Sequence, residues 1–417
     1  MNSVITTEQK GYSRTSLGLL PNDWKIVKLS EYIESLDAGV SVNSEDCPAN
    51  PPEKGILKTS AVNDGRFFPT ENKLIKPNEI HRAKLNPIKD SIIISRMNTP
   101  ELVGEIGYVD KDYPHLFLPD RLWQTRYKGN VCGKWLAYLL TIPNLKRQIK
   151  NIATGTSNSM KNISKTAFLS LEVPLVPINE QQKIANILST WDKAIELKEK
   201  LIEQKKEQKK GLMQRLLTGK VRLPGFKGEW KEVRLGEVLK ERKETGHVHL
   251  ELLAITAQRG IVRRDEVDIK DNSSEDKSKY KRIMPLDIGY NTMRMWQGVS
   301  GVSKYEGIVS PAYTVLKPTD KVDSYFMGYL FKLPKVIDKF RRYSQGLVDD
   351  TLNLKYENFK VIKVRIPQDV NEQKAIAQIL ICVDKEIEFL EKELEALKQQ
   401  KKGLMQLLLT GKVRVKC

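Results

Sequence analysis

One short segment has residue types that could act on a nucleic-acid base: Asn50-Pro51-Pro52-Glu53. It comes close to the Asn-Pro-Pro-aromatic motif of adenine methyltransferases, in which the aromatic ring stacks on a base flipped out of the duplex. Glu53 stands in place of that ring, and no glycine-rich turn between a strand and a helix precedes the segment to hold S-adenosylmethionine. We therefore interpret the segment as a proline-containing loop.

No other group of residues predicts catalysis or a bound metal. The GxxxxGK[ST] motif is absent from the sequence, so ATP hydrolysis would belong to a partner protein. His247 and His249 could chelate a metal from one strand, but a solvated pair is the favoured interpretation. A nuclease cluster of carboxylates stays open on spacing alone. The four cysteines have no paired spacing, which indicates a reduced chain without zinc: Cys47, Cys132, Cys382 and Cys417.

The charge of the chain indicates its class of partner. Its 417 residues carry a net charge of +18, and such a basic protein usually meets a polyanion, with nucleic acid the first candidate. No run of 18 apolar residues exists, and the first twenty residues lack an apolar signal core, so we expect a cytoplasmic chain that does not span a membrane. The length predicts two or three domains.

Residues 179–222 occur twice, because residues 371–414 repeat them at an offset of 192 without a gap and with 29 of 44 positions identical. Repetition at one fixed offset indicates duplication. In each copy the apolar residues step by four and three, which predicts a long helix with a seam for a partner helix. The seam residues are Ile184, Leu188, Trp191, Ile195, Ile376, Leu380, Val383, Ile387, Leu390 and Leu394.

The two seams most simply pair with each other, although two independent amphipathic helices on separate cores are an alternative. Gly219 and Gly411 stand where a helix C-terminus favours positive φ. Residues 410–414 are the counterpart of the segment that leads into the second domain, so we expect them near the start of the first domain. The helices would then run antiparallel and be related by a pseudo-twofold axis.

The segments between the helices also recur in order. Trp24 and Trp230 each precede a strand-like step, and residues 91–95 and 287–291 are each a buried strand candidate followed by a polar loop. We also predict a strand at 58–63 before an Asp-Gly turn at 64–65, a helical stretch at 135–152, and a strand-like stretch at 307–315.

These observations predict an α+β protein with two α/β domains joined by two long antiparallel coiled-coil helices. The expected boundaries are 1–177 for the first domain, 178–220 for the first helix, 221–368 for the second domain, and 369–417 for the second helix with the C-terminal segment.

From about Pro21 to Arg414, the chain resembles the specificity subunit of type I restriction–modification systems. The resemblance rests on Asn-Glu-Gln followed by Ile-Ala-x-Ile-Leu, and on Lys-Lys-Gly-Leu-Met-Gln ending in Leu-Leu-Thr-Gly-Lys-Val-Arg, both of which occur twice. Residues 294–298 (Arg-Met-Trp-Gln-Gly) and 311–316 (Pro-Ala-Tyr-Thr-Val-Leu) are similar to the target domains of that family.

This resemblance implies a non-catalytic subunit whose two target-recognition domains each read one half of a bipartite, asymmetric site in double-stranded DNA. The helices would set the spacer and dock two methyltransferase subunits, and restriction (helicase-nuclease) subunits would join them in defence against foreign DNA. S-adenosylmethionine, ATP and Mg²⁺ would then bind to those partners, and no cofactor or metal to this chain.

In such a protein, lysine and arginine contacts with phosphates supply affinity, and base edges supply specificity. Arginine pairs well with guanine, and asparagine or glutamine with adenine, so polar loop side chains are the best candidates. The candidate DNA-binding residues are Lys58, Thr59, Arg96, Asn98, Ser157, Asn158 and Lys161 in the first domain, and Arg259, Arg294, Trp296, Gln297 and Gln345 in the second.

Three points stay open. Residues 205–210 (Lys-Lys-Glu-Gln-Lys-Lys) could follow the phosphate backbone or be a solvated helix face. The chain could instead be a stand-alone nucleic-acid-binding or regulatory protein, including one that titrates a methyltransferase. It could also be a coiled-coil scaffold whose charge is incidental, and that scaffold would show no DNA binding with a steep salt dependence.

Overall fold

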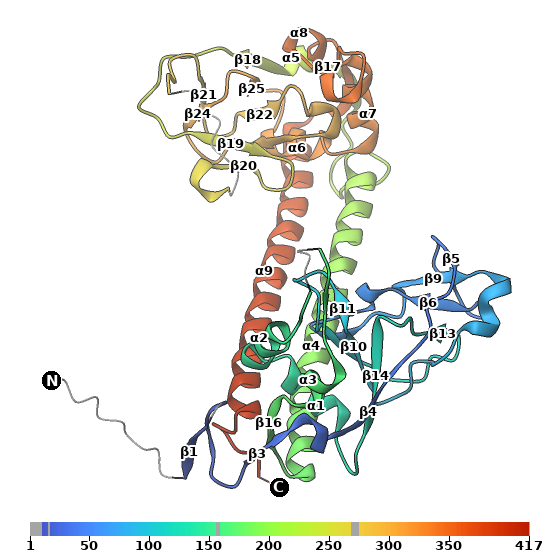
Figure 1. Ribbon diagram of the computed structural model, residues 1–417. Helices are drawn as coiled ribbons and strands as arrows, with labels where there is room; N and C mark the ends of the chain where they lie inside the picture. Colours follow the sequence, from blue (N-terminus) through green and yellow to red (C-terminus); the bar gives the residue numbers. More distant parts are fainter. Residues whose placement is uncertain (1–10, 16, 156–158, 268–274, 417) are drawn as a thin grey trace. The chain divides into compact units, whose positions relative to one another are not determined.

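Two long helices, α4 (Ile178–Leu216) and α9 (Val370–Leu409), organise the fold. The computed structural model describes residues 11–15, 17–155, 159–267 and 275–416. The chain divides into two units: unit 1 is Met1–Leu197 with Leu394–Cys417, and unit 2 is Lys198–Glu393. Each unit therefore contains part of both helices. Within each unit the two helices lie side by side (Figure 1).

The two helices run antiparallel in each unit, as the sequence predicts. In unit 1, Lys401 Nζ lies 2.5 Å from Asp192 Oδ1, while Arg414 Nε lies 2.7 Å from Glu180 Oε1. Residue numbers on one helix thus fall as those on the other rise. In unit 2, Lys198 pairs with Glu393 at 3.1 Å and Lys209 with Asp384 at 2.6 Å, which gives the same direction.

The elements of unit 1 before α4 are β1 (Tyr12–Thr15), β2 (Gly18–Pro21), β3 (Lys25–Lys28), η1 (Leu29–Glu31), β4 (Ile33–Ala38), β5 (Ser44–Glu45), β6 (Gly55–Leu57), η2 (Thr59–Ala61), β7 (Val62–Asn63), β8 (Gly65–Phe67), β9 (Asn72–Ile75), η3 (Pro77–Arg82), β10 (Ile92–Ser95), β11 (Met97–Asn98), β12 (Ile106–Tyr108), β13 (Leu116–Phe117), β14 (Leu122–Tyr127), α1 (Gly133–Leu140), α2 (Pro143–Asn151), β15 (Lys161–Asn162), α3 (Lys165–Leu169) and β16 (Glu172–Leu175).

The elements of unit 2 between α4 and α9 are β17 (Trp230–Arg234), α5 (Leu235–Val238), β18 (Leu239–Arg242), β19 (Leu253–Thr256), β20 (Gly260–Arg263), η4 (Arg264–Glu266), β21 (Lys281–Ile283), β22 (Ile288–Asn291), η5 (Met295–Gln297), β23 (Ser300–Val302), β24 (Gly307–Val309), β25 (Tyr313–Pro318), α6 (Ser324–Leu330), α7 (Pro334–Tyr343), η6 (Asp349–Thr351), α8 (Tyr356–Phe359) and β26 (Lys363–Pro367).

The central sheet has the same strand order in both units. In unit 1 the order is β4-β14-β10-β12-β8-β7, and in unit 2 it is β18-β25-β22-β23. The first four strands correspond one to one and pair antiparallel throughout, so the duplication extends beyond the helices into the domains. Unit 1 extends this sheet with β8, which pairs parallel to β12. Helices combined with mostly antiparallel sheets confirm the predicted α+β class.

The repeated Asn-Glu-Gln motif has a structural explanation in both units. Glu372 in the first turn of α9 is fully buried and accepts two hydrogen bonds from Arg222, at 2.6 and 2.7 Å, and one from Trp230 Nε1 at 3.3 Å. The neighbouring Gln373 accepts from the Asp323 amide at 2.8 Å and donates to the Pro367 carbonyl at 2.9 Å. A buried carboxylate needs this number of donors to offset its lost hydration.

Unit 1 repeats the arrangement with residues from the far end of α9. Glu180 is buried and accepts from Arg414 at 2.7 and 2.9 Å and from Trp24 Nε1 at 3.3 Å. The hydroxyl of Tyr12 donates to the Gly411 carbonyl at 3.0 Å. The expectation that residues 410–414 lie near the start of the first domain is therefore confirmed. We call each Glu-Arg-Trp group a latch.

Gly219 and Gly411 have φ angles of 69° and 68°, as predicted for helix C-termini. In both units the glycine also lies against the latch tryptophan. A Cβ atom on Gly219 would lie 3.2 Å from the Trp230 ring, and one on Gly411 would lie 2.5 Å from Pro21 and 3.1 Å from Trp24. Glycine is thus required for the left-handed conformation and for this close packing.

The residues of the predicted seam differ in their surroundings. Ile184 and Leu188 belong to the main core of unit 1, and Ile376 and Leu380 to that of unit 2. These first turns therefore pack on the domains as well as on the partner helix. Farther along, Ile195, Ile387 and Leu390 are buried, whereas Trp191, Val383 and Leu394 are half-buried.

The charge run 205–210 lies along the helix pair of unit 2. Lys205 pairs with Glu386 at 2.6 Å, Lys206 with Glu391 at 2.9 Å, and Lys209 with Asp384 at 2.6 Å. Because all three lysines are partly exposed, each pair contributes little to stability. The contacts favour the interpretation as a polar helix face over a track for phosphates.

Three local expectations are wrong in part. Residues 59–61 form η2, so only Val62–Asn63 of the expected strand are extended, as β7, whereas the turn with Asp64 at φ 47° and Gly65 at 82° matches the prediction. The helical stretch 135–152 is two helices, because Pro143 at the start of α2 has no amide hydrogen to continue α1. Residues 307–315 divide into β24 and β25, because Pro311 lies in the turn between them.

The packing of α9 gives a stability prediction. Leu380 is fully buried in the main core of unit 2, whereas Phe389 on the same helix is 61% exposed. Leu380→Ala should lower the free energy of unfolding by about 2–5 kcal/mol, because it leaves a cavity. Phe389→Ala is the control and should change it by less than about 0.5 kcal/mol. Equal effects of the two substitutions in urea unfolding would contradict this packing.

Candidate nucleic-acid interface

Two loops meet beside the central sheet of unit 1. One follows β10 and contains Arg96 and β11, and the other is a hairpin that ends in β15. They pair antiparallel, with Met97 opposite Asn162 and Asn98 opposite Lys161, and the Ile163 amide donates to the Arg96 carbonyl at 2.9 Å. The structure therefore brings together Arg96, Asn98 and Lys161, which the sequence predicted on separate loops.

Unit 2 has the same pair of loops. The loop after β22 contains η5, and the hairpin is closed by Gln345 and Asn353, which exchange backbone hydrogen bonds of 2.9 and 2.8 Å. The Leu354 amide donates to the Thr292 carbonyl at 2.9 Å, as Ile163 does to Arg96 in unit 1. We call residues 291–297 and 345–353 the reading loops of unit 2.

A shared asparagine ends both hairpins. The side-chain oxygens of Asn162 and Asn353 are buried and have no hydrogen-bond partner among the described residues. Each hairpin also has glycine as its second residue, Gly155 at φ 155° and Gly346 at φ 145°. The frames of the two hairpins therefore match, although the residues between the glycine and the asparagine differ.

The side chains of the unit 1 candidates have different roles. Asn98 is only 8% exposed, and its amide donates to Ser95 Oγ at 3.1 Å, so it stabilises the loop in this conformation. The Arg96 guanidinium lies 5.8 Å from the centroid of the Trp123 ring, and its Nε atom is buried without a partner among the described residues. Lys161 donates to the Gly155 carbonyl at 2.9 Å across the hairpin.

The other unit 1 candidates lie elsewhere. Lys58 and Thr59 belong to the segment between β6 and β7, and Lys58 lies 3.8 Å from the Glu71 carboxylate. Ser157 and Asn158 lie outside the described residues.

Four of the five unit 2 candidates lie on the reading loops. Arg294, Gln297 and Gln345 are exposed, and Trp296 is half-buried with its ring 5.4 Å from the Arg341 guanidinium. The indole of Trp296 donates to the Met293 carbonyl at 3.1 Å, which fixes the ring. Arg259 lies instead between β19 and β20, where it pairs with Glu266 at 2.6 Å.

Several exposed residues of this surface had not been identified from the sequence. The sequence analysis identified only Gln345 in the unit 2 hairpin and did not predict its apolar apex. The run Arg341-Arg342-Tyr343 at the end of α7, directly before the hairpin, was an available signal. The missed residues are Met293, Arg341, Arg342, Tyr343, Leu347 and Val348.

A half-buried lysine anchors the loop after β22. Lys332, just beyond α6, donates to the carbonyls of Gly298 and Ser300 at 2.7 and 2.8 Å. Burial of the ammonium group, with a smaller effect of the nearby charge of Lys209, lowers the pKa of Lys332 to about 8. The loop that contains Arg294 and Trp296 is thus anchored by an ammonium group whose charged form is destabilised by burial.

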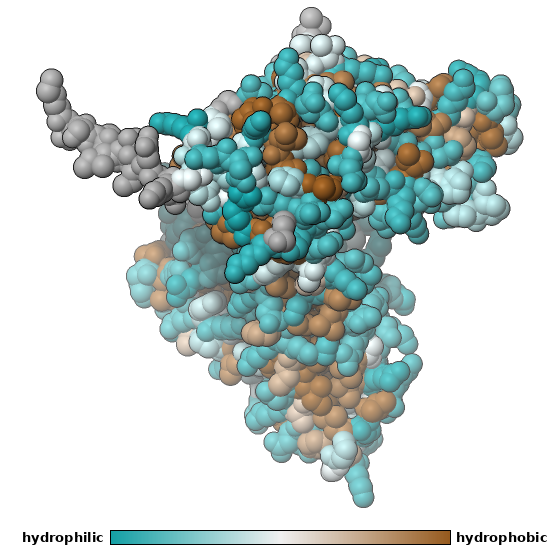
Figure 2. Space-filling view, turned by 90° about the horizontal axis from the view of Figure 1, so that it is seen from below, coloured by the Kyte–Doolittle hydropathy of each residue, from teal (hydrophilic) through white to brown (hydrophobic). Residues whose placement is uncertain are grey.

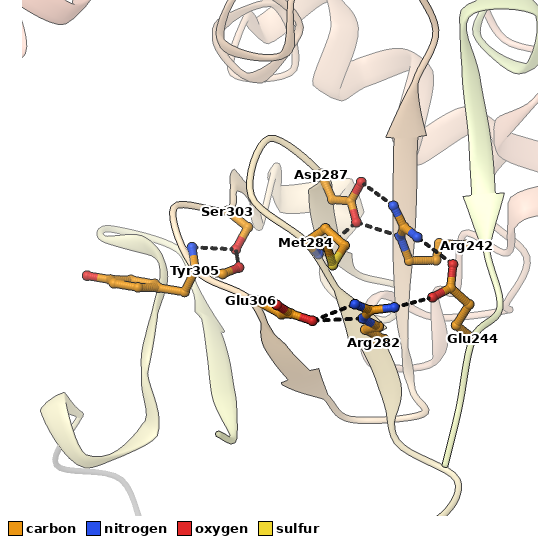
Figure 3. Close-up of polar contacts among 8 residues, drawn as sticks. All are labelled: Arg242, Glu244, Arg282, Met284, Asp287, Ser303, Tyr305 and Glu306. Carbon is orange, nitrogen blue, oxygen red and sulfur yellow. Dashed lines mark hydrogen bonds and ion pairs between the residues drawn. The ribbon is translucent and has the colours of Figure 1, made fainter. Parts of the chain in front are cut away.

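An alternating chain of charges holds the outer strands of unit 2 (Figure 3). Arg242 on β18 pairs with the buried Asp287 at 2.7 Å and also contacts Glu244. Arg282 on β21 lies between Glu244, at 3.0 Å, and Glu306, at 2.6 Å. Strand β21 is thereby tied to β18 and to the start of β22. These ion pairs fix the strands relative to one another, and none of them involves a residue of the reading loops.

Among the described residues, no group of three or more histidine, cysteine or acidic side chains could hold a metal ion. Glu53, in place of the methyltransferase aromatic residue, closes a turn by accepting from the Asn50 amide at 3.0 Å.

None of the helices in the described residues is long and apolar enough to cross a membrane. Hydrophilic residues cover most of the face shown in Figure 2, and hydrophobic residues form separate patches.

Comparisons with known proteins match these features. The family model of the type I restriction modification DNA specificity domain matches residues 21–206 and 269–399. Two curated relatives from Methanocaldococcus jannaschii are each 27% identical. One is described as the putative type I restriction enzyme MjaX specificity subunit, and the match covers 98% of both chains. The other is the type I restriction enzyme MjaVIII specificity subunit, with 95% of this chain and 94% of the relative covered.

Two solved structures share the fold. The S subunit of a type I restriction–modification system from M. genitalium has a TM-score of 0.58 at 18% identity, with 93% of this chain and 97% of that chain covered. A chain from a study of complex assembly and conformational transition in the type I R-M system has a TM-score of 0.56 at 17% identity, with 94% and 99% covered.

The buried lysine gives a pH prediction. Between pH 8 and about 10.5, the unfolded chain binds a proton at Lys332 that the folded chain does not, so this residue makes stability rise with pH. Lys332→Met removes that contribution. Relative to the variant, the wild type should gain about 1–2 kcal/mol of unfolding free energy from pH 7 to pH 9.5.

Urea unfolding at the two pH values measures this gain. Lys335→Met is the matched control, because Lys335 is an exposed lysine on the adjacent α7. The difference between wild type and this control should be the same at both pH values. A Lys332→Met difference that is equally independent of pH would contradict the assigned burial cost.

Proposed function

The chain belongs to the family of type I restriction modification DNA specificity domains, and on that premise we propose that it is the specificity subunit that reads the target site for a type I restriction–modification complex. Each unit reads one half of a bipartite, asymmetric site in double-stranded DNA. The basic net charge of +18 supports binding to phosphates around both half-sites.

One observation carries this proposal: the two units have the same frame but different reading loops. The latch, the central strand order and the loop pair recur in both units. Three side chains of this loop in unit 2, Arg294, Trp296 and Gln297, have no identical counterparts after Arg96 in unit 1, although Met293 corresponds to Met97. Two equal frames with unequal loops are suited to two different half-sites.

Partners supply the chemistry in this proposal. The chain itself is non-catalytic, and it directs two methyltransferase subunits, which bind S-adenosylmethionine, to the target adenine. Restriction subunits with helicase and nuclease activity bind ATP and Mg²⁺ and complete the complex. The two long helices serve as the docking surface for the methyltransferase subunits and set the spacer between the half-sites. The complex acts in the cytoplasm against foreign DNA.

The direct test is a methylation map. The full chain is co-expressed with the methyltransferase of the same genome in a host that does not methylate adenine, and modified adenines are located by single-molecule sequencing. We expect one split motif with two defined parts and an unspecified spacer, because two readers act on one duplex.

A methylated but continuous motif would keep the reading function and contradict the two half-sites. A stable complex with the methyltransferase but no methylation would favour a regulatory protein instead. No complex, together with DNA binding that does not weaken steeply with salt, would favour a coiled-coil scaffold.

A further inference from the structure

An apolar apex projects from the reading hairpin of unit 2. Leu347 is 101% exposed and Val348 is 61% exposed. Single exposed apolar residues are normal on a protein surface, so exposure alone has no functional meaning. Here, however, Met293 and Tyr343 of the adjoining segments are also 46% and 44% exposed. Exposed apolar side chains thus occur at several positions of the reading loops and at the adjoining end of α7.

The hairpin holds this apex in a defined position. Val348 and Thr351 are joined by reciprocal hydrogen bonds, with the Thr351 amide donating to the Val348 carbonyl at 2.9 Å and the Val348 amide donating to Thr351 Oγ1 at 3.3 Å. A Cβ atom on Gly346 would lie 2.6 Å from the Thr351 carbonyl oxygen, so the turn can close only with glycine there. An apex fixed before binding loses little conformational entropy on contact.

Charged neighbours restrict what the apex can approach. Asp349 is neutralised by Arg341, whose guanidinium lies 2.8 Å from its carboxylate, while Asp350 is exposed. A carboxylate beside a phosphate is unfavourable, but it can accept a hydrogen bond from the amino group of cytosine in the major groove. An apolar side chain in that groove has the 5-methyl group of thymine as its natural contact.

The divergence of the two hairpins distinguishes DNA from a protein partner. The bridges Thr154–Asn162 and Gln345–Asn353 each enclose a sequence segment with glycine second and asparagine last. In sequence, none of the six residues from 156 to 161 is identical to its counterpart from 347 to 352. A partner that docks in two equal copies needs the same surface in both units. A surface that differs while its frame is kept is suited instead to a different base sequence in each half-site.

We propose that Leu347 and Val348 are specificity-determining residues that contact thymine 5-methyl groups in the major groove of one half-site. This proposal rests on the proposed function, because it assumes that unit 2 reads DNA. It adds the residues, the groove and the chemical group that is recognised. Arg294 and Gln345 lie on the same loops and are available for polar contacts with neighbouring bases.

The test combines protein and DNA substitutions in the full complex with the methyltransferase. Each thymine of both half-sites is replaced in turn by deoxyuridine, which lacks only the methyl group, and the Kd of each duplex is measured. Wild-type complex should lose about threefold to fivefold in affinity at one or two thymines contacted by unit 2, the expected effect of one methyl group leaving an apolar contact.

The double variant Leu347→Ala/Val348→Ala should bind the thymine and deoxyuridine duplexes equally at those positions. Its response to deoxyuridine elsewhere, including the whole other half-site, should match the wild type. Val248→Ala is the control, because Val248 is also an exposed apolar residue of unit 2, at 56%, but lies outside the reading loops. This control should keep every wild-type response.

Three results would overturn the proposal: unchanged deoxyuridine responses in the double variant, no thymine in either half-site whose response depends on the apex, or loss of assembly with the methyltransferase, which would make the apex a protein contact. Failure of the proposed function is a separate result, since the wild-type complex would then show no preference for any split motif.

Discussion

A buried carboxylate in the first turn of each long helix is the interaction on which the rest of the structure depends. Glu372 has no exposed surface, and its charge is offset by Arg222 and Trp230, which lie beyond the end of the other helix. An uncompensated carboxylate at this depth would cost several kcal/mol. The chain must therefore bring the end of one helix back to the start of the other, and this requirement makes the two helices antiparallel within the unit.

The same constraint in unit 1, through Glu180 and Arg414, explains why one frame can support two different readers. The latch and the glycine beside its tryptophan use residues that are repeated along the chain, whereas the central strands repeat their order but not their sequence. The reading loops start where the central strand leaves the sheet, and their exposed residues, unlike the buried Met295, lie outside the main core. Their side chains can consequently change without loss of the fold, which is the property that a modular reader of DNA needs.

Much of the frame was predictable, because it depends on local and periodic signals. The seams, the glycines after each helix and the buried strand before Arg96 follow from spacing and residue type alone. The meeting of two loops was not predictable, because the pairing of Asn98 with Lys161 depends on tertiary contacts between residues far apart in sequence. Burial of Asn98 and exposure of Leu347 were missed for the same reason: polarity predicts the environment of a loop residue poorly when the loop itself folds against another loop.

A double-mutant cycle on the latch of unit 2 is the most direct test of this constraint. The unfolding free energy of unit 2 is measured for the wild type, Arg222→Ala, Glu372→Gln and the double variant, with a ¹⁹F label on Trp230 to follow this unit. Arg222→Ala should cost about 3–5 kcal/mol, since it leaves a buried charge unpaired. The double variant should recover at least about 1.5 kcal/mol relative to the sum of the single variants. Effects that add within about 0.5 kcal/mol would contradict the claim that this pair closes the unit.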